Sequence, residues 1–171
     1  GAIFGMTWDI AGNENVLGVA KHLYTTMFMN YSTIAAGTFA LAPVLSILFF
    51  SKLKQNKKIT KVALAPAIFN ISEPITFGLP IILNPIYFIP FIIVQPLCFY
   101  IAVFFTKIGF IPVVCNNVPW TVPPIISGIL FTGTIAGGLV QLINLVISMA
   151  IYYPFVKIAD KMELDKMTET E

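Results

Sequence analysis

Between Asn15 and Ala159 the chain carries a single acidic side chain, Glu73, in surroundings that are mostly apolar. Of the 171 residues, 57% are hydrophobic and 11% are charged, and the mean hydropathy is +0.87. Soluble domains contain about 25% charged residues, so this composition indicates an integral membrane protein. A carboxylate is costly in hydrocarbon, and one found there usually faces a polar cavity and has a function. Glu73 is therefore the centre of the functional interpretation.

Three apolar stretches are long enough to cross a bilayer, because a spanning helix needs about 20 residues. They are predicted at residues 28–50, 86–105 and 134–155. Residues 1–27 are of mixed composition and are expected to form an external loop and lead-in. Residues 106–133 are irregular, and their last part, 125–133, is expected to be loop or a short half-helix. Pro43 is a candidate kink in the first span.

Lysines are concentrated in two segments, at residues 51–61 and 157–171. The first holds five lysines and is predicted to be a cytoplasmic loop by the positive-inside rule. As a patch it could also bind an acidic partner or anionic lipid, although a solvated loop is the simpler interpretation. The second is expected to be a polar tail, and its lysines favour a cytoplasmic C-terminus. The net charge of +2 is too small to suggest nucleic acid.

Residues 62–85 are apolar but interrupted by prolines, asparagines and Glu73. Non-helical backbone at membrane depth is tolerated only where protein or a water-filled cavity covers it. Transporters use such discontinuous elements to build binding sites near the bilayer midplane. We therefore predict an all-α membrane protein with about three spanning helices and a re-entrant hairpin that carries Glu73 near its tip.

The polar side chains of this hairpin suit a polyol. The Glu73 carboxylate can accept hydrogen bonds from hydroxyl groups, and the Asn70 amide can both donate and accept. The alternative is that Glu73 is protonated, or paired to a lysine or a backbone donor, and only fixes the hairpin. The membrane setting favours a function for Glu73.

Trp120 and His22 are weaker candidates. The indole of Trp120 offers a flat face for a pyranose and one N–H donor, but it could equally be an interfacial anchor. His22 is the only histidine, and a solvated or interfacial side chain is favoured over a phosphoryl acceptor or general base. Cys98 and Cys115 are isolated and are expected to be small buried hydrophobes. No metal-ligand spacing, cofactor motif or catalytic set is found, and an intramembrane enzyme is disfavoured because acid–base chemistry usually needs a pair.

Four segments carry a family resemblance. Residues 69–85 read FNISEPITFGLPIILNP, 118–128 read VPWTVPPIISG, 142–148 read LINLVIS and 151–155 read IYYPF. Over residues 25 to 160 the chain resembles the membrane component, enzyme IIC, of bacterial phosphoenolpyruvate-dependent sugar phosphotransferase systems, of the lactose/cellobiose/chitobiose type. The first segment is the most specific.

The resemblance implies a homodimeric, multi-pass permease of the bacterial inner membrane that binds a disaccharide, with Glu73, Asn70 and Trp120 as sugar contacts. It also implies that the sugar is phosphorylated by a phosphocysteine on a soluble IIB partner, itself served by IIA, and not by Cys98 or Cys115. Neither a cofactor nor a metal is implied.

The chain begins at Gly1 and lacks a basic leader, so it is expected to be the downstream part of something longer. Members of the resembled family are more than twice as long, and their front half carries dimerising helices and a functional histidine that has no match here. The alternative function is therefore a truncated, non-transporting fragment that needs a missing front half or a full-length homologue.

Overall fold

The computed structural model describes residues 31–32, 34–35, 38–79, 81, 84–112, 116 and 118–169. In these ranges all regular structure is helical, as the sequence predicts. The helices are α3 (Leu41–Phe50), α4 (Lys54–Ile68), α5 (Glu73–Gly78), α6 (Pro85–Lys107), α7 (Ile126–Thr132) and α8 (Ile135–Glu169).

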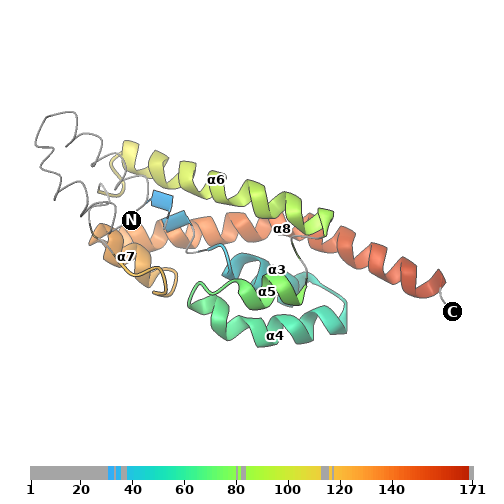
Figure 1. Ribbon diagram of the computed structural model, residues 1–171. Helices are drawn as coiled ribbons and strands as arrows, with labels where there is room; N and C mark the ends of the chain where they lie inside the picture. Colours follow the sequence, from blue (N-terminus) through green and yellow to red (C-terminus); the bar gives the residue numbers. More distant parts are fainter. Residues whose placement is uncertain are drawn as a thin grey trace, which may run out of the picture.

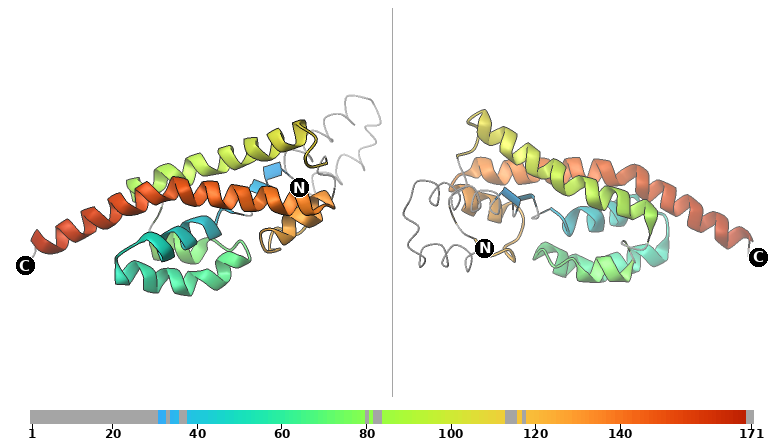
Figure 2. Two further views of the ribbon diagram at one scale, coloured as in Figure 1. Left: turned by 180° about the vertical axis from the view of Figure 1, so that it is seen from behind. Right: turned by 45° about the horizontal axis from the view of Figure 1, so that its top comes forward.

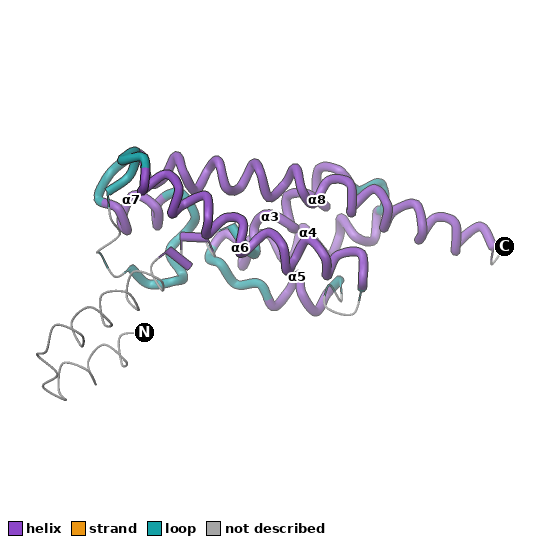
Figure 3. The backbone as a smooth tube through the Cα atoms, turned by 90° about the horizontal axis from the view of Figure 1, so that it is seen from above, coloured by secondary structure: helices purple, strands orange, loops and turns teal. Residues whose placement is uncertain are grey.

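Helix α8 is the central element of the fold. Helices α3, α6 and α7 each pack against it, α4 packs on α3, and α5 packs on α4. Figure 1 shows α6 and α8 side by side, with α3, α4 and α5 grouped against one side of this pair. The same grouping holds in Figure 2, where the C-terminal part of α8 extends beyond the other helices. Figure 3 shows that the molecule is elongated along α8.

The first predicted span, residues 28–50, differs from the expectation of one continuous helix. The described positions 31, 32, 34 and 35 are helical, a turn occupies 38–40, and α3 starts at Leu41. Two local features explain the break. The Thr38 hydroxyl donates to the carbonyl oxygen of Ala35 at 3.0 Å, and Pro43 has no N–H for a helical bond. Pro43 therefore lies in the first turn of a new helix, where proline is tolerated.

The lysine segment 51–61 is also not the loop that was predicted. Only its first three residues link α3 to α4, and the rest is the first half of α4. Lysine and glutamine are good helix formers, and the buried positions recur at helical spacing. These positions are Asn56, Thr60, Ala63 and Ala67. The lysines are thus placed on a helix whose other face packs on α3.

The polar tail predicted from residue 157 is helical as well, because α8 continues to Glu169 without a break. Residues 157–169 contain neither glycine nor proline, so nothing in that sequence stops the helix. The preceding segment, 125–133, contains the short helix α7 and ends at Gly133, whose φ of 66° is left-handed. Of the two structures expected for residues 125–133, a loop or a short half-helix, the structure therefore shows the short helix.

Helix α6 has well-defined ends. The side chain of Asn84 accepts a hydrogen bond from the backbone N–H of Ile86 at 3.0 Å, and Pro85 occupies the first turn. At the other end Gly109 adopts a φ of 77°, which lets the chain leave the helix after Lys107. Within the described residues, α6 and the 135–165 part of α8 are long and apolar enough to cross a membrane, whereas α3 has only 10 residues.

Candidate functional site

The tip of the α4–α5 hairpin is a defined turn built around Asn70. Its φ of 60° lies in the left-handed region, which asparagine enters more readily than most residues. The backbone N–H of Asn70 donates to Ala67 at 3.1 Å, and that of Ile71 donates to Pro66 at 3.1 Å. This pair of bonds is a Schellman motif, which satisfies the last carbonyl groups of α4. The turn thus ends α4 and starts α5 at Glu73.

The side chain of Asn70 ties this tip to a distant loop. Its amide nitrogen donates to the carbonyl oxygens of Trp120 at 2.8 Å and Val122 at 3.0 Å. The amide oxygen is buried and has no hydrogen-bond partner among the described residues. Because both amide protons are used, the structure gives Asn70 a positioning role, and sugar contact by its nitrogen would require these bonds to break.

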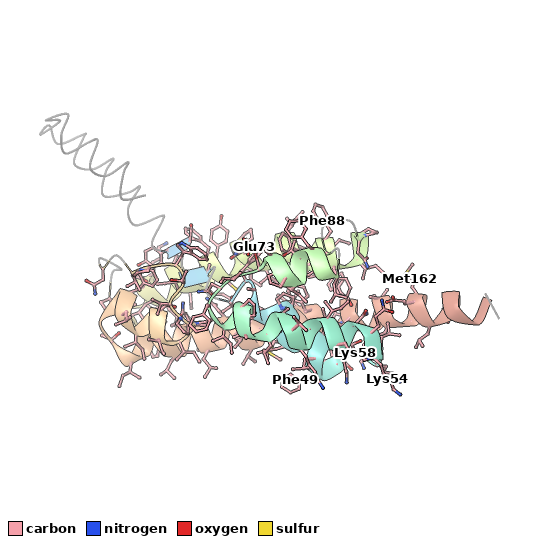
Figure 4. The ribbon with its side chains drawn as sticks, turned by 60° about the horizontal axis from the view of Figure 1, so that its bottom comes forward. Phe49, Lys54, Lys58, Glu73, Phe88 and Met162 are labelled. Atoms are coloured by element: carbon pink, nitrogen blue, oxygen red, sulfur yellow. The ribbon has the colours of Figure 1, made fainter. Side chains whose placement is uncertain are left out.

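Glu73 occupies the first turn of α5 and is exposed. The buried side chains of Ile75 and Thr76 fix this helix, and a carboxylate in its first turn is favourable for the helix dipole. Within the described residues no hydrogen bond or ion pair engages the carboxylate, so the pairing to a lysine or a backbone donor is not seen there. Figure 4 shows Glu73 near the tip and Lys54 and Lys58 at the opposite end of the hairpin.

Trp120 lies in the loop that receives the Asn70 amide, and its side chain is 60% exposed. The structure therefore brings the hairpin tip and the Trp120 loop together through backbone carbonyls. An exposed indole suits either a sugar face or a bilayer interface, so both interpretations of Trp120 stand. The exposed carboxylate of Glu73 and the exposed indole of Trp120 are features of this region that could contact a polyol directly.

The polar residues of α8 were missed by the sequence analysis. Gln141, Asn144 and Ser148 are fully buried and follow one helical face at spacings of three and four. The Gln141 amide oxygen accepts from the backbone N–H groups of Ile125 at 2.7 Å and Gly128 at 2.8 Å. Two amide side chains in an apolar stretch were the sequence signal that could have revealed these buried contacts. Gln141 holds α7 on α8, and Asn144 holds α6 on α8.

Of the remaining candidates, the structure describes only Cys98. Cys98 is fully buried, and its sulfur lies 3.3 Å from the Ser148 hydroxyl, so it is a packed core residue. His22 and Cys115 lie outside the described residues. Within the described ranges no three histidine, cysteine, aspartate or glutamate side chains gather as metal ligands.

The surface of α6 is unusual for a protein in water. Large apolar side chains on it are exposed, namely Phe88, Ile89, Ile92, Ile93, Leu97, Tyr100 and Phe104. Soluble monomers rarely expose contiguous apolar patches of this kind. The helical fold, two helices of membrane length and this apolar face together favour a helical membrane protein.

Comparison with known proteins shows to which family of helical membrane proteins the chain is similar. The sequence profile of the family "Phosphotransferase system, EIIC" matches residues 2–94. The oligo-beta-mannoside-specific EIIC component of Bacillus subtilis is 42% identical over 151 residues, which are 86% of this chain and 34% of that protein. The lactose-specific EIICB component of Staphylococcus aureus strain N315 is 33% identical over 171 residues, 96% of this chain and 30% of that protein.

A solved structure agrees with these relatives. The transporter ChbC, the IIC component of the N,N'-diacetylchitobiose-specific phosphotransferase system, superposes with a TM-score of 0.75 at 35% identity. The match covers 83% of this chain and 34% of ChbC. The chain therefore belongs to the EIIC family of the phosphotransferase system, and it spans about a third of the length of the relatives it matches.

Proposed function

We propose that this chain forms a sugar-binding transport region of a bacterial phosphotransferase-system permease, with a disaccharide as substrate. Glu73 accepts hydrogen bonds from sugar hydroxyls, Trp120 stacks on the ring, and Asn70 contacts the sugar or holds the hairpin tip beside it. The exposed Glu73 carboxylate, next to the hydrogen-bonded turn at Asn70, is the observation that carries this proposal. The names of the relatives, which refer to oligo-beta-mannosides, lactose and diacetylchitobiose, support a disaccharide.

The proposal includes a membrane topology. Residues 28–50, 86–105 and 134–155 form three crossings, and the α4–α5 hairpin re-enters the membrane so that Glu73 reaches a polar cavity. Lys54 and Lys58 of α4 lie at the same end of the molecule as Met162 in the C-terminal part of α8, as Figure 4 shows. The positive-inside rule assigns this end, including the C-terminus, to the cytoplasm of the bacterial cell.

The chemistry takes place on a partner. Glu73 is the only carboxylate of the membrane region, and acid–base catalysis usually needs a second titratable group. We therefore assign phosphorylation of the sugar to a soluble IIB phosphocarrier, served by IIA, that docks at the cytoplasmic face. The Staphylococcus aureus relative is named as an EIICB component, which supports this partnership. A homodimer embedded in membrane lipid completes the proposed assembly.

Calorimetric titration of the purified chain in detergent tests the proposal, with cellobiose, lactose and diacetylchitobiose as ligands. Glu73→Gln keeps the shape of the side chain but removes its charge. Charge-assisted hydrogen bonds contribute about 1.5–3 kcal/mol, so we expect affinity to fall by roughly 10- to 100-fold. Lys58→Gln, at the other end of the hairpin, is the matched control and is expected to bind like the wild type. Equal affinity of Glu73→Gln and the wild type would refute the assignment.

A second candidate function follows from length, because the chain spans about a third of its relatives. In this case the chain is a non-transporting fragment, and sugar binding requires further residues of the permease. The titration separates the two functions. No binding by the chain alone, with binding restored when the front half of a homologous permease is co-expressed, identifies the fragment.

A further inference from the structure

Three charged side chains of α8 contact the end of α3, the three-residue link to α4, and the start of α4. The ammonium group of Lys157 donates to the carbonyl oxygen of Phe50 at 2.9 Å. One turn later Asp160 receives hydrogen bonds from the link itself, and a further turn on, Glu163 accepts one from the side chain of Asn56 at 3.3 Å. The spacing of three residues places each of these side chains next to the following one along α8. We call this set the α8 clamp.

Asp160 is the centre of the α8 clamp and is only 3% exposed. Its carboxylate accepts from the Ser51 hydroxyl at 2.7 Å and from the backbone N–H of Lys52. The Ser51 hydroxyl oxygen in turn accepts from the N–H of Leu53 at 3.2 Å. Charge-assisted hydrogen bonds of this kind are shorter and stronger than neutral ones. One aspartate thus fixes all three residues of the link.

The link controls where the hairpin lies. Helix α4 packs on α3 and α5 packs on α4, and the link is the non-helical backbone from which α4 departs. Leu53, the residue before α4, makes no capping hydrogen bond with its side chain. Asp160, more than 100 residues further along the chain, instead holds the residues that directly precede α4. The geometry at the start of α4 consequently depends on α8.

A small change at the link is amplified at the tip. Helix α4 has 15 residues and is roughly 22 Å long at about 1.5 Å per residue. A rotation of about 10° at its start therefore moves the tip by roughly 4 Å. Val156 and Ala159 of α8 also join the apolar core around α3, α4 and α5. These apolar contacts and the two bonds of Asn70 to the Trp120 loop also hold the hairpin, and the α8 clamp acts together with them at the start of α4.

We propose that Asp160 is a positioning residue that sets the location of the hairpin tip by fixing the Ser51–Leu53 link to α8. The importance of that location for sugar binding depends on the proposed function of Glu73. Asp160 itself contacts neither sugar nor Glu73, because it lies at the opposite end of α4.

The test measures the distance between two spin labels in the purified chain, one at the tip (Ile71→Cys) and one on the exposed side of α8 (Val146→Cys). Cys115 is replaced by serine, and Cys98 is fully buried and is not expected to react. Asp160→Ala is the main variant. Ser51→Ala removes only one hydrogen bond to Asp160, and Asp160→Asn keeps the size of the side chain but removes its charge. These two milder variants test the proposal if Asp160→Ala does not fold. Lys161→Ala, an exposed position on α8, is the matched control.

We expect a narrow distance distribution in the wild type and in Lys161→Ala. In Asp160→Ala the mean should shift or the distribution should broaden by about 4 Å, with smaller changes in the two milder variants. Folded variants that all reproduce the wild-type distribution would overturn the proposal. The measurement needs no sugar, so its failure is distinguishable from failure of the proposed function.

Sugar affinity is the second readout. If Glu73 binds sugar, Asp160→Ala should weaken cellobiose binding by about tenfold, because misplacement of a binding group by ångströms loses affinity without a change at the site itself. Lys161→Ala should not. If the tip shifts but the sugar affinity does not change, Asp160 does not influence the sugar site. The proposal that Asp160 positions the tip would still hold.

Discussion

The side-chain nitrogen of Asn70 lies 2.8 Å from the carbonyl oxygen of Trp120, so the hairpin tip is attached to the loop that follows α6. Two of the three residues predicted to contact sugar are thereby joined through an amide and a backbone carbonyl. The third, Glu73, follows three residues after Asn70 at the start of α5. The position of the carboxylate consequently depends on the turn at Asn70.

The first prediction separates the two contributions of Asn70 to stability. Asn70→Gly keeps the left-handed backbone and loses only the two side-chain hydrogen bonds, which together contribute about 2 kcal/mol. Asn70→Ala also strains the backbone and should cost about 1 kcal/mol more. Thermal unfolding in detergent micelles measures both. Equal unfolding temperatures for Asn70→Ala and Asn70→Gly would contradict the left-handed turn.

The second prediction concerns Gln141, whose oxygen receives the N–H groups of Ile125 and Gly128 and the hydroxyl of Ser127. Gln141→Leu leaves these buried donors unpaired, and each unsatisfied group costs about 1–3 kcal/mol. Gln141→Glu keeps the acceptor but loses the bond that the amide nitrogen donates to the Ile34 carbonyl. Both variants should be destabilised in thermal unfolding. Wild-type stability in Gln141→Leu would show that α7 is held by other contacts.

The composition and the long apolar runs predicted the helical fold, because a chain in lipid must pair its backbone groups within helices. The turn at the hairpin tip was also predictable, since Asn70 and Glu73 interrupt an apolar segment. The α8 clamp was not predictable. Asp160 and Ser51 are 109 residues apart, and neither has a local sequence signal for the contact. The lysines of α4 were mistaken for a loop because their charge concealed a helical pattern of buried residues.

The third prediction tests the close packing of α7 on α8. A Cβ atom on Gly137 would collide with the carbonyl oxygen of Gly128 and with the side chain of Thr132. Overpacking of this kind typically costs about 1–3 kcal/mol, so Gly137→Ala should lower the unfolding temperature in micelles. Leu139→Ala, two positions along α8 and 47% exposed, is the control and should have little effect. If both variants unfold alike, the two helices are not in close contact in the membrane.

The final prediction compares two tyrosines, one whose hydroxyl has no hydrogen-bond partner among the described residues and one whose hydroxyl makes a hydrogen bond. The hydroxyl of Tyr87 is buried, with 2% of the residue exposed, and lacks a hydrogen-bond partner among the described residues. The hydroxyl of Tyr31 donates to the Thr106 hydroxyl at 2.8 Å. Because an unpaired buried polar group costs about 1–3 kcal/mol, Tyr87→Phe should raise the free energy of unfolding by about 1 kcal/mol.

Tyr31→Phe removes a hydrogen bond that is made, and should lower the free energy of unfolding by about 1 kcal/mol. Both substitutions delete one oxygen and keep the ring, so the difference in sign isolates the hydrogen bond from packing. Denaturant unfolding of the two variants in the same detergent gives the comparison. A loss of stability in Tyr87→Phe equal to that in Tyr31→Phe would show that the Tyr87 hydroxyl has a partner in the membrane, such as a buried water molecule.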